Sequence, residues 1–127
     1  MHPTLVLKSL MPPFGGGPLV AGVAAESFKM QTDKKLQEHV TSLGRYMLLK
    51  LNGLKESSKN IKAVRGLGLM IAVDITKPSM EVIDECANLG LLIAKSGDNT
   101  IRIHPSLVVK REEVDKGLNI LGKVLLA

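Results

Sequence analysis

Apolar residues recur every three or four positions along residues 34–56: Leu36, Val40, Leu43, Met47, Leu51 and Leu54. This spacing predicts an amphipathic helix with one buried stripe, and Thr32 and Asp33 are suited to cap its start. Before it, the residues from Leu19 to Met30 are mostly small and apolar, and Pro18 fits the first position of a helix. We expect two successive helices, the first of which should pack closely against another element.

Beyond residue 60, short apolar runs separated by glycines and turn residues replace the helical spacing. Gly66 and Gly68 predict a bend or tight turn between the first two runs, and residues 96–99 supply a turn between the last two. The four predicted strands are 61–64, 69–75, 91–95 and 100–104. Paired strands of this kind are typical of a small, mostly antiparallel sheet.

Two more helices are predicted among these strands. Pro78 and Ser79 open one that ends at Gly90; its predicted buried face is Val82, Ile83, Cys86 and Ala87. The other covers residues 112–126, with Glu112 and Glu113 at its positive end. Its predicted stripe is Val114, Leu118, Leu121 and Leu125.

The order of these elements predicts an α+β fold, with a small, mostly antiparallel sheet covered by helices and preceded by a helical arm. We expect an irregular N-terminal segment at 1–17, the arm at 18–56 and the α+β domain at 57–127. At 127 residues, the chain has the length of one domain.

Composition narrows the possible functions. Hydrophobic residues make up 45% and charged residues 23%, which is ordinary for a globular chain. The net charge of +5, from 17 basic and 12 acidic residues, is scattered. Phe14, Phe28 and Tyr46 are the only aromatic residues, so a nucleic-acid module, which stacks bases on aromatic rings, is disfavoured.

The single cysteine, Cys86, excludes an internal disulfide and a cysteine-cluster metal site. We expect it to pack in the core rather than to react. No apolar run has the length of a membrane span, and residues 1–8 lack the charged-then-apolar order of a signal peptide. The sequence therefore predicts a soluble, cytoplasmic chain.

Most candidate chemistry is weak. His2, His39 and His104 lack metal-ligand spacing and a neighbouring nucleophile, so we expect no metal site. The glycines at 15–17 precede a helix and could hold a phosphate. However, they match neither the P-loop nor the dinucleotide pattern, and Pro18 removes an amide. A flexible hinge into the helix is the preferred interpretation.

Arg102 is more informative. Strand alternation places Ile101 and Ile103 on one face and Thr100, Arg102 and His104 on the other. If the isoleucines face the core, Arg102 points outward or toward whatever docks there. Its guanidinium offers a rigid fork that matches a carboxylate. From the pattern alone, both a surface arginine and a ligand-binding arginine remain open.

Three motifs in order carry a resemblance. They are FGGGPL at 14–19, VRGLGLM at 64–70 and NTIRIHPSL at 99–107. Together with the helix pattern they resemble the C-terminal part of class III (fold type I) pyridoxal-phosphate aminotransferases, in particular the acetylornithine and ornithine branch. The resemblance covers about residue 10 to the end.

The resemblance implies a C-terminal fragment of a cytoplasmic amino-acid biosynthetic enzyme that transfers an amino group to 2-oxoglutarate. In that family the arginine of the third motif binds the α-carboxylate of the amino-acid or 2-oxo-acid substrate; here it is Arg102. The Schiff-base lysine and the cofactor domain match nothing in this chain. We therefore expect no catalysis and no bound pyridoxal phosphate in the chain alone, and expect a large cofactor domain or subunit as its partner.

The chain departs from the family just before the first motif. A His-Gly-Ser-Thr-like run is typical there, and its threonine reaches the cofactor phosphate of the neighbouring subunit. Here the residues are Leu10, Met11, Pro12 and Pro13, which cannot supply that hydroxyl. We expect this phosphate contact to be lost.

Two other expectations stand beside the fragment. A free-standing α+β module with an exposed Arg102 could bind small carboxylates, or it could act as a protein-interaction module that pairs with a separate large-domain subunit. Without a large domain, the helix from Leu19 to Met30 would have an uncovered apolar face. We expect it to self-associate or stay mobile.

Overall fold

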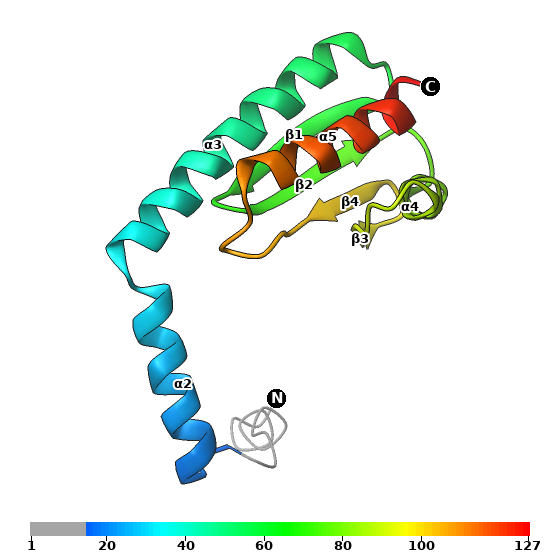
Figure 1. Ribbon diagram of the computed structural model, residues 1–127. Coiled ribbons are helices and arrows are strands. Elements are labelled where there is room, and N and C mark those ends of the chain that lie inside the picture. Colours follow the sequence, from blue (N-terminus) through cyan, green and yellow to red (C-terminus); the bar gives the residue numbers. More distant parts are fainter. Residues whose placement is uncertain (1–14) are drawn as a thin grey trace, which may run out of the picture. The chain divides into compact units, whose positions relative to one another are not determined.

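The computed structural model of the chain describes residues 15–127 (Figure 1). Its helices and strands are α2 (Pro18–Gln31), α3 (Lys34–Ser57), β1 (Ile61–Leu67), β2 (Met70–Ile75), α4 (Ser79–Asn88), β3 (Ala94–Gly97), β4 (Thr100–Ile103) and α5 (Arg111–Leu126). The chain divides into two compact units at Lys34. The expected segment boundaries at 17 and 56 stay predictions.

The sheet of the second unit has the strand order β1-β2-β4-β3, and every pair of neighbours is antiparallel. The expected α+β class with a small antiparallel sheet is confirmed. The crossover through α4 leads to β3 at the edge of the sheet, and β4 then returns between β3 and β2 (Figure 1). As a result, the segment around Arg102 lies in the interior of the sheet.

Two strand boundaries differ from the prediction. β1 continues to Leu67, because Gly66 pairs with Ile71 and the chain turns only at Gly68, whose φ is +55°. β3 begins at Ala94 rather than at residue 91. Leu91 instead follows the C-terminus of α4 and helps to close that helix, since its N–H donates to the carbonyl of Cys86 at 2.8 Å.

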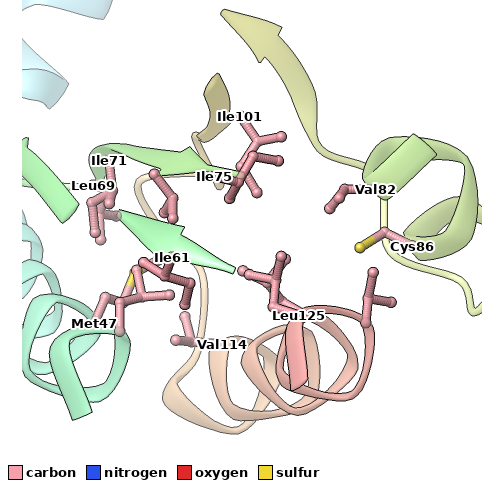
Figure 2. Packing of buried hydrophobic residues seen from close by; sticks show 14 of the residues in the cluster. Met47, Ile61, Leu69, Ile71, Ile75, Val82, Cys86, Ile101, Val114 and Leu125 are labelled. Carbon is pink, nitrogen blue, oxygen red and sulfur yellow. The ribbon is translucent and has the colours of Figure 1, made fainter. Parts of the chain in front are cut away.

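Helices α3, α4 and α5 cover one face of the sheet and enclose the core (Figure 2). The buried stripe of α3 is Leu43, Met47 and Leu51, and Val82 and Cys86 face the same core from α4. Ala87 is exposed, so its predicted place on the buried face of α4 is wrong. The buried face of α4 is narrower than predicted, because its buried residues are only Ser79, Val82 and Cys86.

Cys86 is fully buried, as expected, and burial raises the pKa of its thiol to about 11. We expect a thiol reagent at pH 8 to label the folded chain at least about 100-fold more slowly than the chain unfolded in urea. Because the pKa is higher in the folded state, the associated stability is complete below about pH 8.5 and declines as the pH rises toward 11. Rapid labelling of the folded chain would contradict this placement.

Helix α2 begins after Gly17 and ends at the Thr32 cap. No residue of α2 is buried, and Leu19, Val23, Phe28 and Met30 are all exposed. The helix therefore has no packing partner among the described residues of its unit. No helix in the described part of the chain is long and apolar enough to span a membrane.

Candidate functional site

The sheet has one face that α3, α4 and α5 do not cover. Strand alternation puts Met70, Ala72 and Asp74 of β2 on this face, opposite the buried Ile71, Val73 and Ile75. Leu67 on β1 is 89% exposed and Met70 is 52% exposed. We call this surface the open face; it carries apolar and charged side chains together.

Arg102 lies on the open face in the middle of β4. It is paired with Ala72 of β2 on one side and with Ala94 of β3 on the other. Two alanines as neighbours leave the long side chain unobstructed. Arg102 is exposed, and its guanidinium makes no hydrogen bond or ion pair within residues 15–127.

A shallow hollow surrounds this arginine, lined by Leu92, Ile93, Ala94, Arg102 and His104. Apolar side chains and one cation in an open hollow fit a small carboxylate whose carbon chain lies against the leucine and isoleucine. The predicted alternation agrees with this placement, because Ile101 is fully buried and Ile103 is partly buried against the core.

Three further residues on the open face form a hydrogen-bonded cluster that we call the Asp74 cluster. Arg65 of β1 donates from Nη1 to Asp74 Oδ2, and Thr100 Oγ1 donates to Asp74 Oδ1 at 2.7 Å. The hydrogen bond from Arg65, followed by that from Thr100, holds the pKa of Asp74 below its usual range. Asp74 therefore stays ionised to a lower pH than an unpaired aspartate does.

Sequence analysis did not single out the Asp74 cluster. The available signal was a lone carboxylate inside the apolar strand 69–75, on the same alternating face as Met70 and Ala72. Its partners come from β1 and β4, so pairing them required the strand order. Local sequence patterns do not predict that strand order.

Neither of the two histidines among residues 15–127 belongs to a metal-binding arrangement. His39 Nε2 donates to the carbonyl of Val109 at 2.9 Å and so ties α3 to the segment before α5. His104 is exposed at the hollow beside Arg102. Residues 15–127 contain no cluster of three metal-ligating side chains, and His2 lies outside the described residues.

The structure adds no support for a phosphate site at the glycine-rich start of the arm. Gly17 is the N-cap of α2 and Pro18 follows it directly, so one of the first amides of the helix is missing. The residues that depart from the family pattern, Leu10, Met11, Pro12 and Pro13, lie outside the described residues.

The described residues do not fit a pyridoxal phosphate site. A Schiff-base lysine needs a pocket that removes it from water and lowers its pKa. Among residues 15–127, every lysine is exposed except Lys77, which is half-buried and donates to the carbonyl of Ala127. The chemistry of the cofactor is therefore not assigned to this part of the chain.

Comparison with known proteins identifies the family. The class is that of the aminotransferases: the profile of the family "Aminotransferase class-III" matches residues 3–125. The chain belongs to this family. Its resemblance to acetylornithine and ornithine aminotransferases, drawn from the three motifs, is confirmed.

Similar proteins cover most of this chain but extend far beyond it. The acetylornithine aminotransferase of Clostridium acetobutylicum is 40% identical over 84% of the chain, which covers 28% of that protein. The corresponding enzyme of Methanothermobacter thermautotrophicus is 34% identical over 88% of the chain and 29% of its own length. The solved acetylornithine aminotransferase of Elizabethkingia anophelis superposes with a TM-score of 0.82 at 30% identity, over 91% of this chain and 32% of that one. The chain thus spans less than a third of these relatives.

Proposed function

We propose that this chain contributes the substrate-carboxylate site of a pyridoxal-phosphate aminotransferase of the acetylornithine or ornithine type. The complete enzyme would transfer an amino group to 2-oxoglutarate, in cytoplasmic amino-acid biosynthesis. One observation carries the proposal: among residues 15–127 the Arg102 guanidinium has no partner, and it lies on the open face beside a hollow lined by Leu92, Ile93, Ala94 and His104. Its family membership indicates which carboxylate it would meet.

Arg102 would act by binding and orienting the substrate. Its fork can make two parallel hydrogen bonds to an α-carboxylate, which fixes both the position and the rotation of the molecule. Holding the substrate in one orientation is a large part of what an enzyme contributes to a two-substrate reaction. In this proposal, the domain supplies geometry and the cofactor supplies the bond chemistry.

The cofactor would be held by residues outside the matched segment. Pyridoxal phosphate, when bound, provides the carbonyl that accepts the amino group and an electron sink for the reaction. No described lysine is placed to hold it. We accordingly propose that the chain alone does not catalyse transamination and that a large cofactor domain or subunit is its partner.

A hybrid enzyme tests this function. The matched segment of the Clostridium acetobutylicum acetylornithine aminotransferase, 108 residues long, is exchanged for the corresponding residues of this chain. We expect the hybrid to show the visible absorbance of bound pyridoxal phosphate and to transfer an amino group from acetylornithine to 2-oxoglutarate. A hybrid that binds the cofactor but transfers nothing would count against the proposal and favour a free-standing carboxylate-binding or protein-interaction module.

The exposed arm gives a separate prediction for the chain as it stands. We propose that α2 associates with a second copy of itself, because Leu19, Val23 and Met30 line an apolar hollow along it. Substituting Val23→Glu is expected to shift the size-exclusion volume to that of a monomer at all concentrations. Ser42→Glu, on an exposed position of α3, is the matched control and should leave association unchanged. A wild-type chain that is strictly monomeric at high concentration would refute the prediction.

A further inference from the structure

Two arginines lie at corresponding positions on either side of Asp74. In the register of β1 with β2, Arg65 is opposite Ala72 while Ala63 is opposite Asp74. In the register of β2 with β4, Arg102 is opposite Ala72 while Thr100 is opposite Asp74. Each arginine is thus one diagonal step from the same carboxylate. Diagonal neighbours on adjacent strands are about 7–8 Å apart, within reach of a long side chain.

Only one of these two arginines holds the carboxylate. Arg65 is hydrogen-bonded to Oδ2 of Asp74, and the hydroxyl of Thr100 occupies Oδ1. Thr100 stands on β4, the strand of Arg102, so the oxygen nearest that strand already has a donor. Arg102 is left without a partner among residues 15–127.

We infer that Arg65 and Thr100 are positioning residues that hold Asp74 away from Arg102 and so keep the Arg102 guanidinium available for a substrate carboxylate. This inference rests on the proposed role of Arg102. Without Arg65, the nearest carboxylate on the open face has one remaining guanidinium to pair with, and that is Arg102. Asp74 would then compete with the substrate for the same fork of N–H donors.

The charge state of Asp74 supports the argument. Its two hydrogen bonds keep its pKa low, so at neutral pH it is a full anion and a true competitor. An exposed ion pair is weak, and its competition should weaken substrate binding by about two- to fivefold. This weakening is small compared with the effect of removing Arg102 itself, but it can be measured in the isolated chain.

The test uses the 127-residue chain and observes each arginine separately by NMR of its Nε–H group. The probe is 2-oxoglutarate, titrated while the signal of Arg102 is followed. We expect Arg65→Gln to weaken binding by about two- to fivefold and to slow proton exchange at the Arg102 guanidinium before any probe is added. The double variant with Arg65→Gln and Asp74→Asn should recover the wild-type affinity, because the competing carboxylate is gone.

A matched control separates competition from net charge. Lys95→Gln removes the same charge from β3, close to Arg102, and likewise frees a carboxylate, that of Asp98. It should leave the affinity unchanged, since Asp98 is 95% exposed and Lys95 is opposite Ile101 rather than beside the hollow. Backbone amide spectra of all variants verify that each is folded.

Each outcome decides something. If Arg65→Gln leaves both the affinity and the ligand-free exchange of Arg102 unchanged, or if the double variant binds as weakly as the single one, the inference is wrong while the role of Arg102 stands. Binding to Arg102→Gln, which lacks the guanidinium signal, is followed by the backbone amide signals of Ile93 and Ala94 at the hollow. If this variant binds the probe as well as the wild type does, the proposed function fails, and the positioning role that rests on it fails too.

Discussion

Replacing Arg102 with glutamine in the hybrid enzyme is expected to lower kcat/KM for 2-oxoglutarate about 100-fold. Hydrogen bonds to charged groups contribute roughly 1.5–3 kcal/mol, and glutamine is uncharged, shorter than arginine and without its fork of donors. The loss of about 2.7 kcal/mol corresponds to two factors of ten. Steady-state kinetics at several 2-oxoglutarate concentrations would measure it.

Two further variants serve as controls for this result. Arg102→Lys retains the charge without the planar fork, and we expect it to recover only part of the lost activity. Arg45→Gln removes one arginine from an exposed position on α3, away from the open face, and should be neutral. An Arg102→Gln hybrid as active as its parent would exclude a direct contact with the substrate.

Of the substitutions proposed here, Gly44→Ala is expected to lower the free energy of unfolding the most. Gly44 is buried in α3 at the point where that helix meets the β1–β2 turn. A methyl group there would overlap the carbonyl oxygen of Gly68 and lie 2.7 Å from its carbonyl carbon. Both are backbone atoms, so helix and hairpin must move apart, at a cost of about 1–3 kcal/mol. Urea unfolding followed by circular dichroism would report the change.

The control lies in the same helix. Gly53 is exposed and has no atom within 4 Å of an added methyl group. Gly53→Ala should therefore raise the free energy of unfolding by about 0.5–1 kcal/mol through helix propensity. Equal effects of the two substitutions would mean that α3 does not approach the turn as closely as described.

The helices of this chain could be predicted from sequence because their signals are local. The stripe of α3 and the alternation around Ile101 depend only on neighbouring residues. The turn at Gly68 was partly visible for the same reason. The close approach of Gly44 to Gly68 was not, because it depends on how two distant elements pack.

The residues of the candidate site likewise differ in whether local sequence could predict their placement. Arg102 could be placed on a face from its own strand, and its role came from resemblance. The Asp74 cluster joins three strands in the order β1-β2-β4, which local patterns do not contain. The hydrogen bond that the Tyr46 hydroxyl donates to Asp115 links α3 to α5. It joins residues 69 positions apart and could not be predicted from local patterns either.

The most direct test of the account compares two amino acceptors in the hybrid enzyme. 2-Oxoglutarate carries an α-carboxylate beside its carbonyl, while succinic semialdehyde keeps the carbonyl and the distal carboxylate but lacks that group. If Arg102 binds the α-carboxylate, Arg102→Gln should lower kcat/KM about 100-fold for 2-oxoglutarate and change it little for the semialdehyde. An equal fall for both acceptors would contradict the account, because it would show that Arg102 supports the structure rather than the α-carboxylate.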